Sequence, residues 1–100
     1  MRVEFERTGG VAGIPLTWSP APDTLPHTDA SQLTRLVEAS RFFDLAHDTS
    51  GAPAGADRFT YRITIDDGRR SHTVHVGEST APESLRPLIH WLTDAARRAR

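Results

Sequence analysis

The stretch from Arg58 to Val76 constrains the fold of this chain more strongly than any other. Bulky residues stand at alternate positions in its two halves: Phe59, Tyr61, Ile63 and Ile65 in the first, and His72, Val74 and Val76 in the second. A period of two, rich in aromatic and β-branched residues, is typical of strands that bury one face. The Asp66–Arg69 segment between the halves has the composition of a turn, since Gly68 accepts a positive φ. The stretch therefore predicts a β-hairpin. Because an isolated hairpin is not stable in water, the rest of the chain must cover its apolar face.

Two shorter strands are predicted near the N-terminus. Arg2–Arg7 alternates apolar and charged residues, which indicates a strand with a charged outer face. After the glycine-rich segment Thr8–Gly13, the alternation resumes over Ile14–Trp18. Pro15 lacks a backbone N–H, so the second strand is expected at the edge of the sheet, where a missing donor costs little.

The chain changes to helical spacing over Asp29–Ser40. Apolar residues recur there every three or four positions: Leu33, Leu36 and Val37. Asp29 and Gln32 have the spacing of a capping box, in which two side chains bond free backbone N–H groups at a helix start. Phe42 and Phe43 follow directly, as though the chain turned back to place aromatic rings beneath this helix.

A second helix is predicted near the C-terminus. Its apolar stripe again has helical spacing: Leu85, Leu88, Ile89, Leu92 and Ala96. Thr80–Glu83 matches a second capping box. Pro87 lies within the stripe, and since proline removes a helical hydrogen bond, a kink is expected near Arg86. Arg97 and Arg98 suit the negative end of the helix dipole.

Together these segments give the order β-β-α-β-β-α in a single domain over residues 1–100. Two helices packed on one face of a four-stranded antiparallel sheet bury the apolar side of every element, so an α+β fold is predicted. The connection His47–Asp57 is rich in Gly, Ala and Pro, and we expect it to contribute little to the core.

The composition excludes several classes of function. The chain has no cysteine, which rules out disulfides and thiolate chemistry. A net charge of -1 gives no overall attraction to nucleic acid. The mean hydropathy is -0.45, no apolar run reaches membrane-spanning length, and the N-terminus has no apolar leader segment. We therefore expect a monomeric protein of the cytoplasm that binds neither nucleic acid nor membrane.

No residue pattern indicates catalysis or metal binding. Of the five histidines, His72 and His75 are three apart on a predicted strand, so they point to opposite faces and cannot share an ion. Paired carboxylates occur only at Asp66 and Asp67, in the predicted turn, where solvation is expected. No nucleophile elbow, metalloprotease motif or nucleotide-binding glycine pattern is present. We expect no enzymatic activity, no metal site and no cofactor.

The segment Thr8–Pro15, TGGVAGIP, admits two interpretations. It can be a loose hairpin connection whose glycines adopt positive φ. It can also be a narrow, apolar-tipped loop whose bare backbone lies close to a partner. The residues alone favour the first interpretation.

Four ordered segments resemble the emfourin family: VEFERTGGVAGIPL, LTRLVEASRFFDL, ADRFTYRITIDDG and APESLRPLIHWLTDAAR. The most distinctive pattern lies in the first segment, at Arg7, Gly9, Gly10, Val11, Ala12, Ile14 and Pro15. Members of this family are small proteinaceous inhibitors of thermolysin-like zinc metalloproteases of the protealysin type. The resemblance therefore implies a non-catalytic protein whose partner is such a protease and whose zinc belongs to the enzyme.

The resemblance also implies a protease-binding site. The candidate residues are Gly9, Gly10, Val11, Ala12, Gly13, Ile14 and Pro15. Thermolysin-like enzymes are expected to prefer a bulky apolar side chain just after the scissile bond, which Val11 or Ile14 would supply. Pro15 would hinder cleavage after Ile14. Both zinc ligation and simple blockage of the cleft stay open as modes of inhibition.

The alternative function is a non-catalytic interaction module that binds an unrelated partner. Such a module would use the strand edge at Ile14–Trp18 or the polar outer face of the sheet. That face is predicted to carry Arg62, Thr64, Thr73 and His75.

Overall fold

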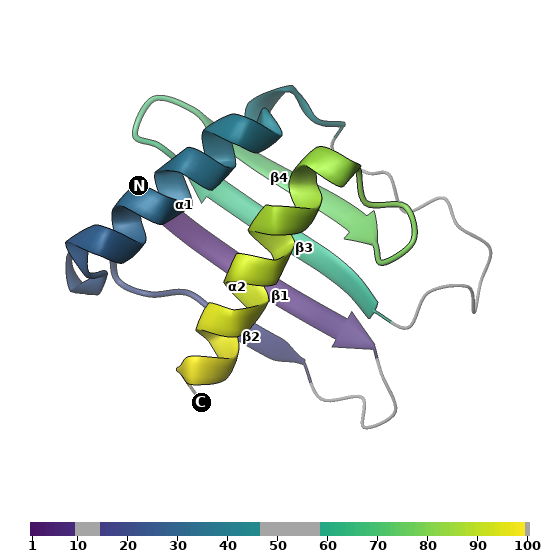
Figure 1. Ribbon diagram of the computed structural model, residues 1–100, viewed down its shortest axis with the longest axis horizontal. Helices are drawn as coiled ribbons and strands as arrows, with labels where there is room; N and C mark the ends of the chain where they lie inside the picture. Colours follow the sequence, from purple (N-terminus) through teal and green to yellow (C-terminus); the bar gives the residue numbers. More distant parts are fainter. Residues whose placement is uncertain (10–14, 47–58, 100) are drawn as a thin grey trace.

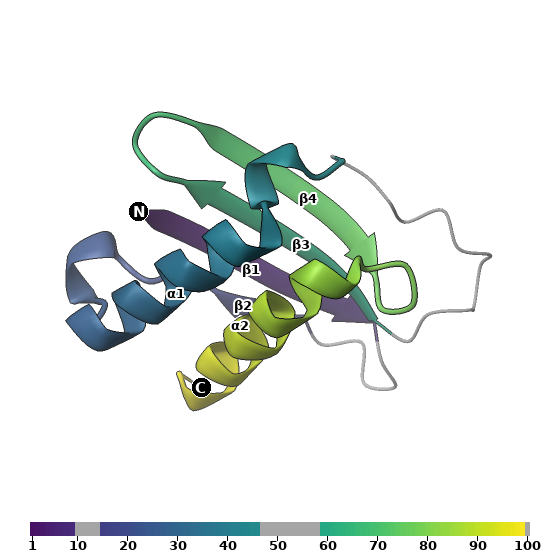
Figure 2. The same ribbon diagram turned by 45° about the horizontal axis from the view of Figure 1, so that its top comes forward.

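Four antiparallel strands form one sheet in the order β2-β1-β3-β4 (Figure 1). The computed structural model describes residues 1–9, 15–46 and 59–99. The strands are β1 (Arg2–Gly9), β2 (Leu16–Trp18), β3 (Phe59–Asp66) and β4 (Ser71–Gly77). The helices are α1 (His27–Ser40) and α2 (Arg86–Arg98), and short 3-10 turns occupy Pro22–Thr24, Phe42–Asp44 and Glu83–Leu85. Both helices lie on the same face of the sheet (Figure 2). The predicted α+β order is confirmed.

The predicted hairpin is confirmed: β3 and β4 pair with Ile63 opposite Val74 and Asp66 opposite Ser71. Gly68 adopts a φ of 93° in the turn, as the turn composition predicts. Strand β1 lies between β3 and β2, so Phe5 has Ile63 on one side and Trp18 on the other. The sheet is therefore built outward from the hairpin, and β2 is an edge strand as predicted.

One apolar core fills the space between the sheet and the two helices. The sheet contributes Val3, Phe5, Leu16, Tyr61, Ile63, Ile65, Val74 and Val76, and the helices contribute Leu33, Val37, Leu88, Ile89, Leu92 and Ala96. Phe42 is fully buried, because Arg41 takes a left-handed φ of 53° and turns the chain back under α1. The predicted return of aromatic rings beneath the first helix is thus confirmed for Phe42.

Both predicted capping boxes are wrong. Helix α1 begins at His27, directly after Pro26 and before Asp29, and no side chain caps it. Asp29 instead lies in the first turn, where its charge favours the helix dipole. At the second site, the Thr80 hydroxyl accepts a hydrogen bond from the Gly77 N–H over 3.0 Å and closes a turn.

The predicted kink at Pro87 is also wrong. The preceding residues Glu83–Leu85 form a 3-10 turn, and α2 begins at Arg86. Pro87 therefore stands in the first helical turn, where backbone N–H groups have no helical partner and a missing one costs nothing. The apolar stripe beyond it is buried as predicted.

Two boundaries differ from expectation or lie outside the described part of the chain. Strand β2 begins at Leu16, so Pro15 precedes the strand, and Ile14 is outside the described residues. The connection His47–Asp57 is likewise outside them. Within residues 1–9, 15–46 and 59–99, no helix has the length and apolar character needed to cross a membrane.

Candidate functional site

The candidate segment Gly9–Pro15 leaves the sheet between β1 and β2. Arg7 and Leu16 form the last cross-strand pair before it. Gly9 also pairs with Phe59 of β3 and has a φ of 98°, a backbone conformation that side chains with a Cβ resist. Both ends of the segment are therefore held by the sheet.

The structure describes the two ends of the predicted site. Gly9 and Pro15 are both exposed. The other predicted site residues lie outside the described residues: Gly10, Val11, Ala12, Gly13 and Ile14. Their role in binding stays a prediction.

Arg7 and Phe59 pack together at the base of this segment. The Arg7 guanidinium carbon lies 4.2 Å from the centroid of the Phe59 ring. A cation over an aromatic face is attracted by the ring's negative face, by about 0.5–1 kcal/mol at exposed sites. The contact joins β1 to β3 two residues before Gly9, so it stiffens the strand ends from which the segment emerges.

Tyr61 lies beside this contact on the inner, helix-facing side of the sheet. Its ring stacks on Phe5 with centroids 6.1 Å apart and is buried. Burial raises the pKa of the Tyr61 phenol above 10.0, and the charge of Glu78 raises it further. The guanidinium groups of Arg7, Arg97 and Arg86 act in the opposite direction. The hydroxyl is therefore a neutral hydrogen-bond donor at physiological pH.

A small polar cavity opens next to Tyr61. Its lining residues are Tyr61, Glu78, Ala81, Arg86, Ile89 and His90, and its volume is about 40 Å³. A single water needs roughly 10–15 Å³ of such space, so the cavity suits a few waters and is too small for a substrate.

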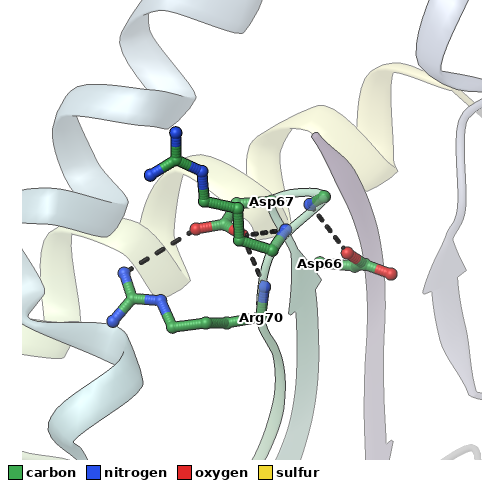
Figure 3. Close-up of polar contacts among 5 residues, drawn as sticks. Asp66, Asp67 and Arg70 are labelled. Atoms are coloured by element: carbon green, nitrogen blue, oxygen red, sulfur yellow. Dashed lines mark hydrogen bonds and ion pairs between the residues drawn. The ribbon is translucent and has the colours of Figure 1, made fainter.

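At the other end of the sheet, the two adjacent carboxylates act as turn caps (Figure 3). Asp66 Oδ1 accepts a hydrogen bond from the Gly68 N–H over 2.9 Å. Asp67 Oδ1 accepts two, from the Arg69 and Arg70 N–H groups, both over 2.8 Å. Asp67 Oδ2 also lies 3.7 Å from Arg70 Nη2. The backbone N–H groups of Arg70 and Arg69 lower the pKa of Asp67 below 3.8. The pair is therefore structural, with no arrangement for acid–base work.

This turn gives a pH-dependent prediction. A carboxyl whose folded pKa is lowered adds stability above its unfolded pKa and loses that contribution as the pH falls through the folded value. Asp67→Asn removes the charge and keeps an acceptor oxygen. We expect its melting temperature to lie below that of the parent at pH 7, and the difference to shrink as the pH falls below 3.8. Thermal unfolding monitored by circular dichroism across this range measures it. A difference that is constant with pH would contradict the assignment.

A hollow of about 390 Å³ lies between the second half of α1 and the same turn. Arg70 covers part of it, with its guanidinium carbon 4.1 Å from the centroid of the Phe43 ring. Charges of both signs line the hollow, from Glu38, Arg41 and Asp67 as well as Arg70. It therefore presents no single ligand chemistry.

The histidines do not form a metal site in the described part of the chain. His72 lies on the inner face, where Nε2 is 2.8 Å from the Leu45 carbonyl oxygen and the ring contacts Phe42. His75 pairs with Arg62 in the opposite, outer-facing set of positions. The prediction that His72 and His75 point to opposite faces is confirmed. No group of three or more histidine, aspartate or glutamate side chains is gathered around a common point in residues 1–9, 15–46 and 59–99.

Neither α1 nor α2 lies on the outer face of the sheet (Figure 2). Arg62 Nη2 lies 3.3 Å from Glu6 Oε1 across the β1–β3 pair. The Thr64 and Thr73 hydroxyl oxygens lie 2.8 Å apart and share a hydrogen bond. These contacts join polar side chains of neighbouring strands across the outer face.

Sequence reasoning missed the arginines that gather near the candidate segment. Arg7 follows Val3 and Phe5 at alternate positions of β1, and this spacing alone indicated that it lies on the inner face with them. Arg86, His90 and Arg97 have helical spacing, which could have indicated one exposed stripe on α2. Only the fold shows that this stripe and Arg7 lie around the same tyrosine.

Comparison with known proteins supports one family. The family model described as Emfourin matches residues 5–93 of the chain. The match therefore includes the whole candidate segment, the second part of β1 before it and all of β2 after it. Searches of curated proteins and of solved structures gave no match.

Proposed function

Because the chain belongs to the Emfourin family, we propose that it is a proteinaceous inhibitor of thermolysin-like zinc metalloproteases of the protealysin type. Membership of this family supports a protease-inhibitor role in general. The observation that carries the proposal is the family match over residues 5–93, which covers most of β1, the other three strands, all of α1 and most of α2. In this proposal residues 1–100 act as one inhibitor domain, and one chain binds one protease molecule.

We assign the inhibitory contact to Gly9–Pro15. Three features of the described residues support this choice. The segment is flanked by antiparallel strands in register, its first residue has a glycine-specific backbone, and Arg7 packs on Phe59 at its base. A segment whose ends are already ordered loses less conformational entropy on binding, so more of the contact energy appears as affinity.

Within the cleft, Val11 or Ile14 would fill the apolar pocket of the protease. The glycines on either side would let the main chain approach the cleft floor, since they carry no Cβ. Pro15 would oppose hydrolysis of the bond after Ile14. The zinc stays with the enzyme, and this chain needs no cofactor of its own.

Titration of a purified thermolysin-like metalloprotease with this protein tests the proposal. Hydrolysis of a small peptide substrate is followed at increasing protein concentration. We expect activity to fall to a residual level near zero at about one equivalent, because protease–inhibitor complexes are among the tightest protein complexes known. A serine protease assayed in parallel should be unaffected. Undiminished metalloprotease activity at a large excess, or digestion of the protein, would contradict the proposal.

The alternative is a non-catalytic interaction module that uses the outer sheet face or the β2 edge. The observation in its favour is that both α1 and α2 lie on the opposite face of the sheet (Figure 2). An intact protein that leaves the metalloprotease fully active would favour this alternative.

A further inference from the structure

One side of α2 carries a stripe of exposed basic residues. Arg86, His90 and Arg97 are separated by about one and two helical turns, so they lie on the same side of the helix. All three are exposed, whereas Leu88 and Leu92 face the core. Helix α2 crosses the sheet obliquely (Figure 1), and Arg86 and His90 line a small cavity together with Tyr61 of β3.

Arg7 and Tyr61 face this stripe from the sheet. They are opposite one another across the β1–β3 pair, on the inner face. Arg86 lines the same small cavity as Tyr61, and Arg97 lies on the same side of α2 as Arg86. We call the surface formed by Arg7, Tyr61, Arg86 and Arg97 the arginine shelf.

The arginine shelf has more positive charge than the neighbouring residues neutralise. Among the described residues, Glu78 is the one carboxylate whose charge affects the pKa of Tyr61. None of the three arginines lies within ion-pair distance of a carboxylate in the described part of the chain; the pairs there join Arg62 to Glu6 and Arg70 to Asp67. The Tyr61 hydroxyl also makes no hydrogen bond to a described residue, and it remains accessible to solvent.

We propose that the arginine shelf binds carboxylate side chains on the rim of the protease cleft, beside the pocket that receives Gly9–Pro15. This proposal rests on the proposed function of the chain as a protease inhibitor. Guanidinium groups bind carboxylates through charge-assisted hydrogen bonds, and a phenol donates a further one. Arginine and tyrosine are also among the residues that dominate interface energies. The preferred target is thus a metalloprotease with an acidic cleft rim.

The charges of the arginine shelf lie outside the central contact, so we expect them to change mainly the association rate constant. Complementary charges outside the central contact accelerate encounter, by tenfold to a thousandfold at low ionic strength, and salt removes this advantage. The shelf begins two residues from Gly9, so it would orient the segment toward the cleft before contact. Dissociation would depend mainly on the segment itself.

The test uses two double variants of the full chain with equal charge change. Arg86→Gln/Arg97→Gln removes exposed shelf charges and leaves the Arg7–Phe59 packing in place. Arg35→Gln/Arg69→Gln removes two exposed arginines from α1 and the hairpin turn. Association rate constants for the protease are measured by stopped-flow inhibition at several salt concentrations. We expect the shelf variant to associate about tenfold more slowly at low salt, with a flatter salt dependence. The control should stay within about twofold of the parent.

The outcomes separate this proposal from the proposed function. If both double variants slow association equally, net charge alone explains the effect and the shelf proposal is overturned. If neither changes the rate while the parent inhibits, the shelf proposal alone is overturned. A parent protein that does not inhibit any thermolysin-like metalloprotease overturns both. Melting temperatures of all variants should match the parent, since the substituted side chains are exposed.

Discussion

Val11→Asp should abolish tight inhibition of a thermolysin-like protease while leaving the fold intact. An aspartate in the apolar pocket would lose its hydration without gaining a partner, and burial of an unpaired polar group costs several kcal/mol. Each 1.4 kcal/mol is tenfold in affinity, so we expect the inhibition constant to rise by at least about a hundredfold. Progress curves at a series of inhibitor concentrations measure this change.

Two further variants make that result interpretable. Gly10→Val should also weaken inhibition, because it adds a side chain where the main chain must approach the cleft. Arg98→Ala changes an exposed residue outside both the segment and the arginine shelf, and it should inhibit like the parent. If Val11→Asp inhibits as tightly as the parent, Gly9–Pro15 is only a connection and the binding surface lies elsewhere.

Ile63→Ala should lower the free energy of unfolding by about 2–5 kcal/mol, the range for large-to-small changes in a packed core. Ile63 is fully buried in the middle of the sheet, with Phe5 and Val74 opposite it on the neighbouring strands. Its methyl groups share the core with Leu88 and Leu92 of α2, so truncation would leave a cavity that rigid neighbours on both sides cannot fill. Urea unfolding monitored by tryptophan fluorescence measures the loss.

The adjacent residue on the same strand provides the control. Arg62 points to the outer face and pairs with Glu6 at 3.3 Å, with its side chain more than half exposed. An exposed ion pair contributes about 0–1 kcal/mol, so Arg62→Ala should change stability far less than Ile63→Ala. A larger loss for Arg62→Ala than for Ile63→Ala would show that the two faces of β3 are assigned the wrong way round.

The sheet and the helical stripes were predictable because burial imposes a strict period on them. Tyr61, Ile63 and Ile65 are buried at alternate positions, as the sequence pattern requires of a half-buried strand. Helix starts were not predictable from the capping signature. Pro26 and Pro87 determine where the helices begin, since proline already has a helical φ or blocks the preceding residue from the helix. The capping residues compete with these prolines, and the sequence does not show which signal prevails.

The candidate site was predictable only as a segment of chain. Its glycines and apolar residues, Gly9–Pro15, were recognisable together with the family resemblance. The arginine shelf required the register of β1 on β3, which places Arg7 opposite Tyr61, and the direction of α2 across the sheet. Neither follows from local pattern, because both depend on how distant elements pack. The assignment of Val11 and its neighbours to the protease contact stays a prediction.

The position of β1 has a consequence for the lifetime of the molecule. This strand is paired on both sides and contributes Val3 and Phe5 to the core, yet only Gly9–Pro15 joins it to the strands that follow. The covalent link holds β1 near its neighbours at an effective concentration of about millimolar. A single cut in the segment would separate the strand from the rest of the domain, and its rebinding would then depend on the protein concentration. A molecule hydrolysed there would lose its central strand and its binding surface together, so resistance to cleavage and integrity of the fold are one property of this chain.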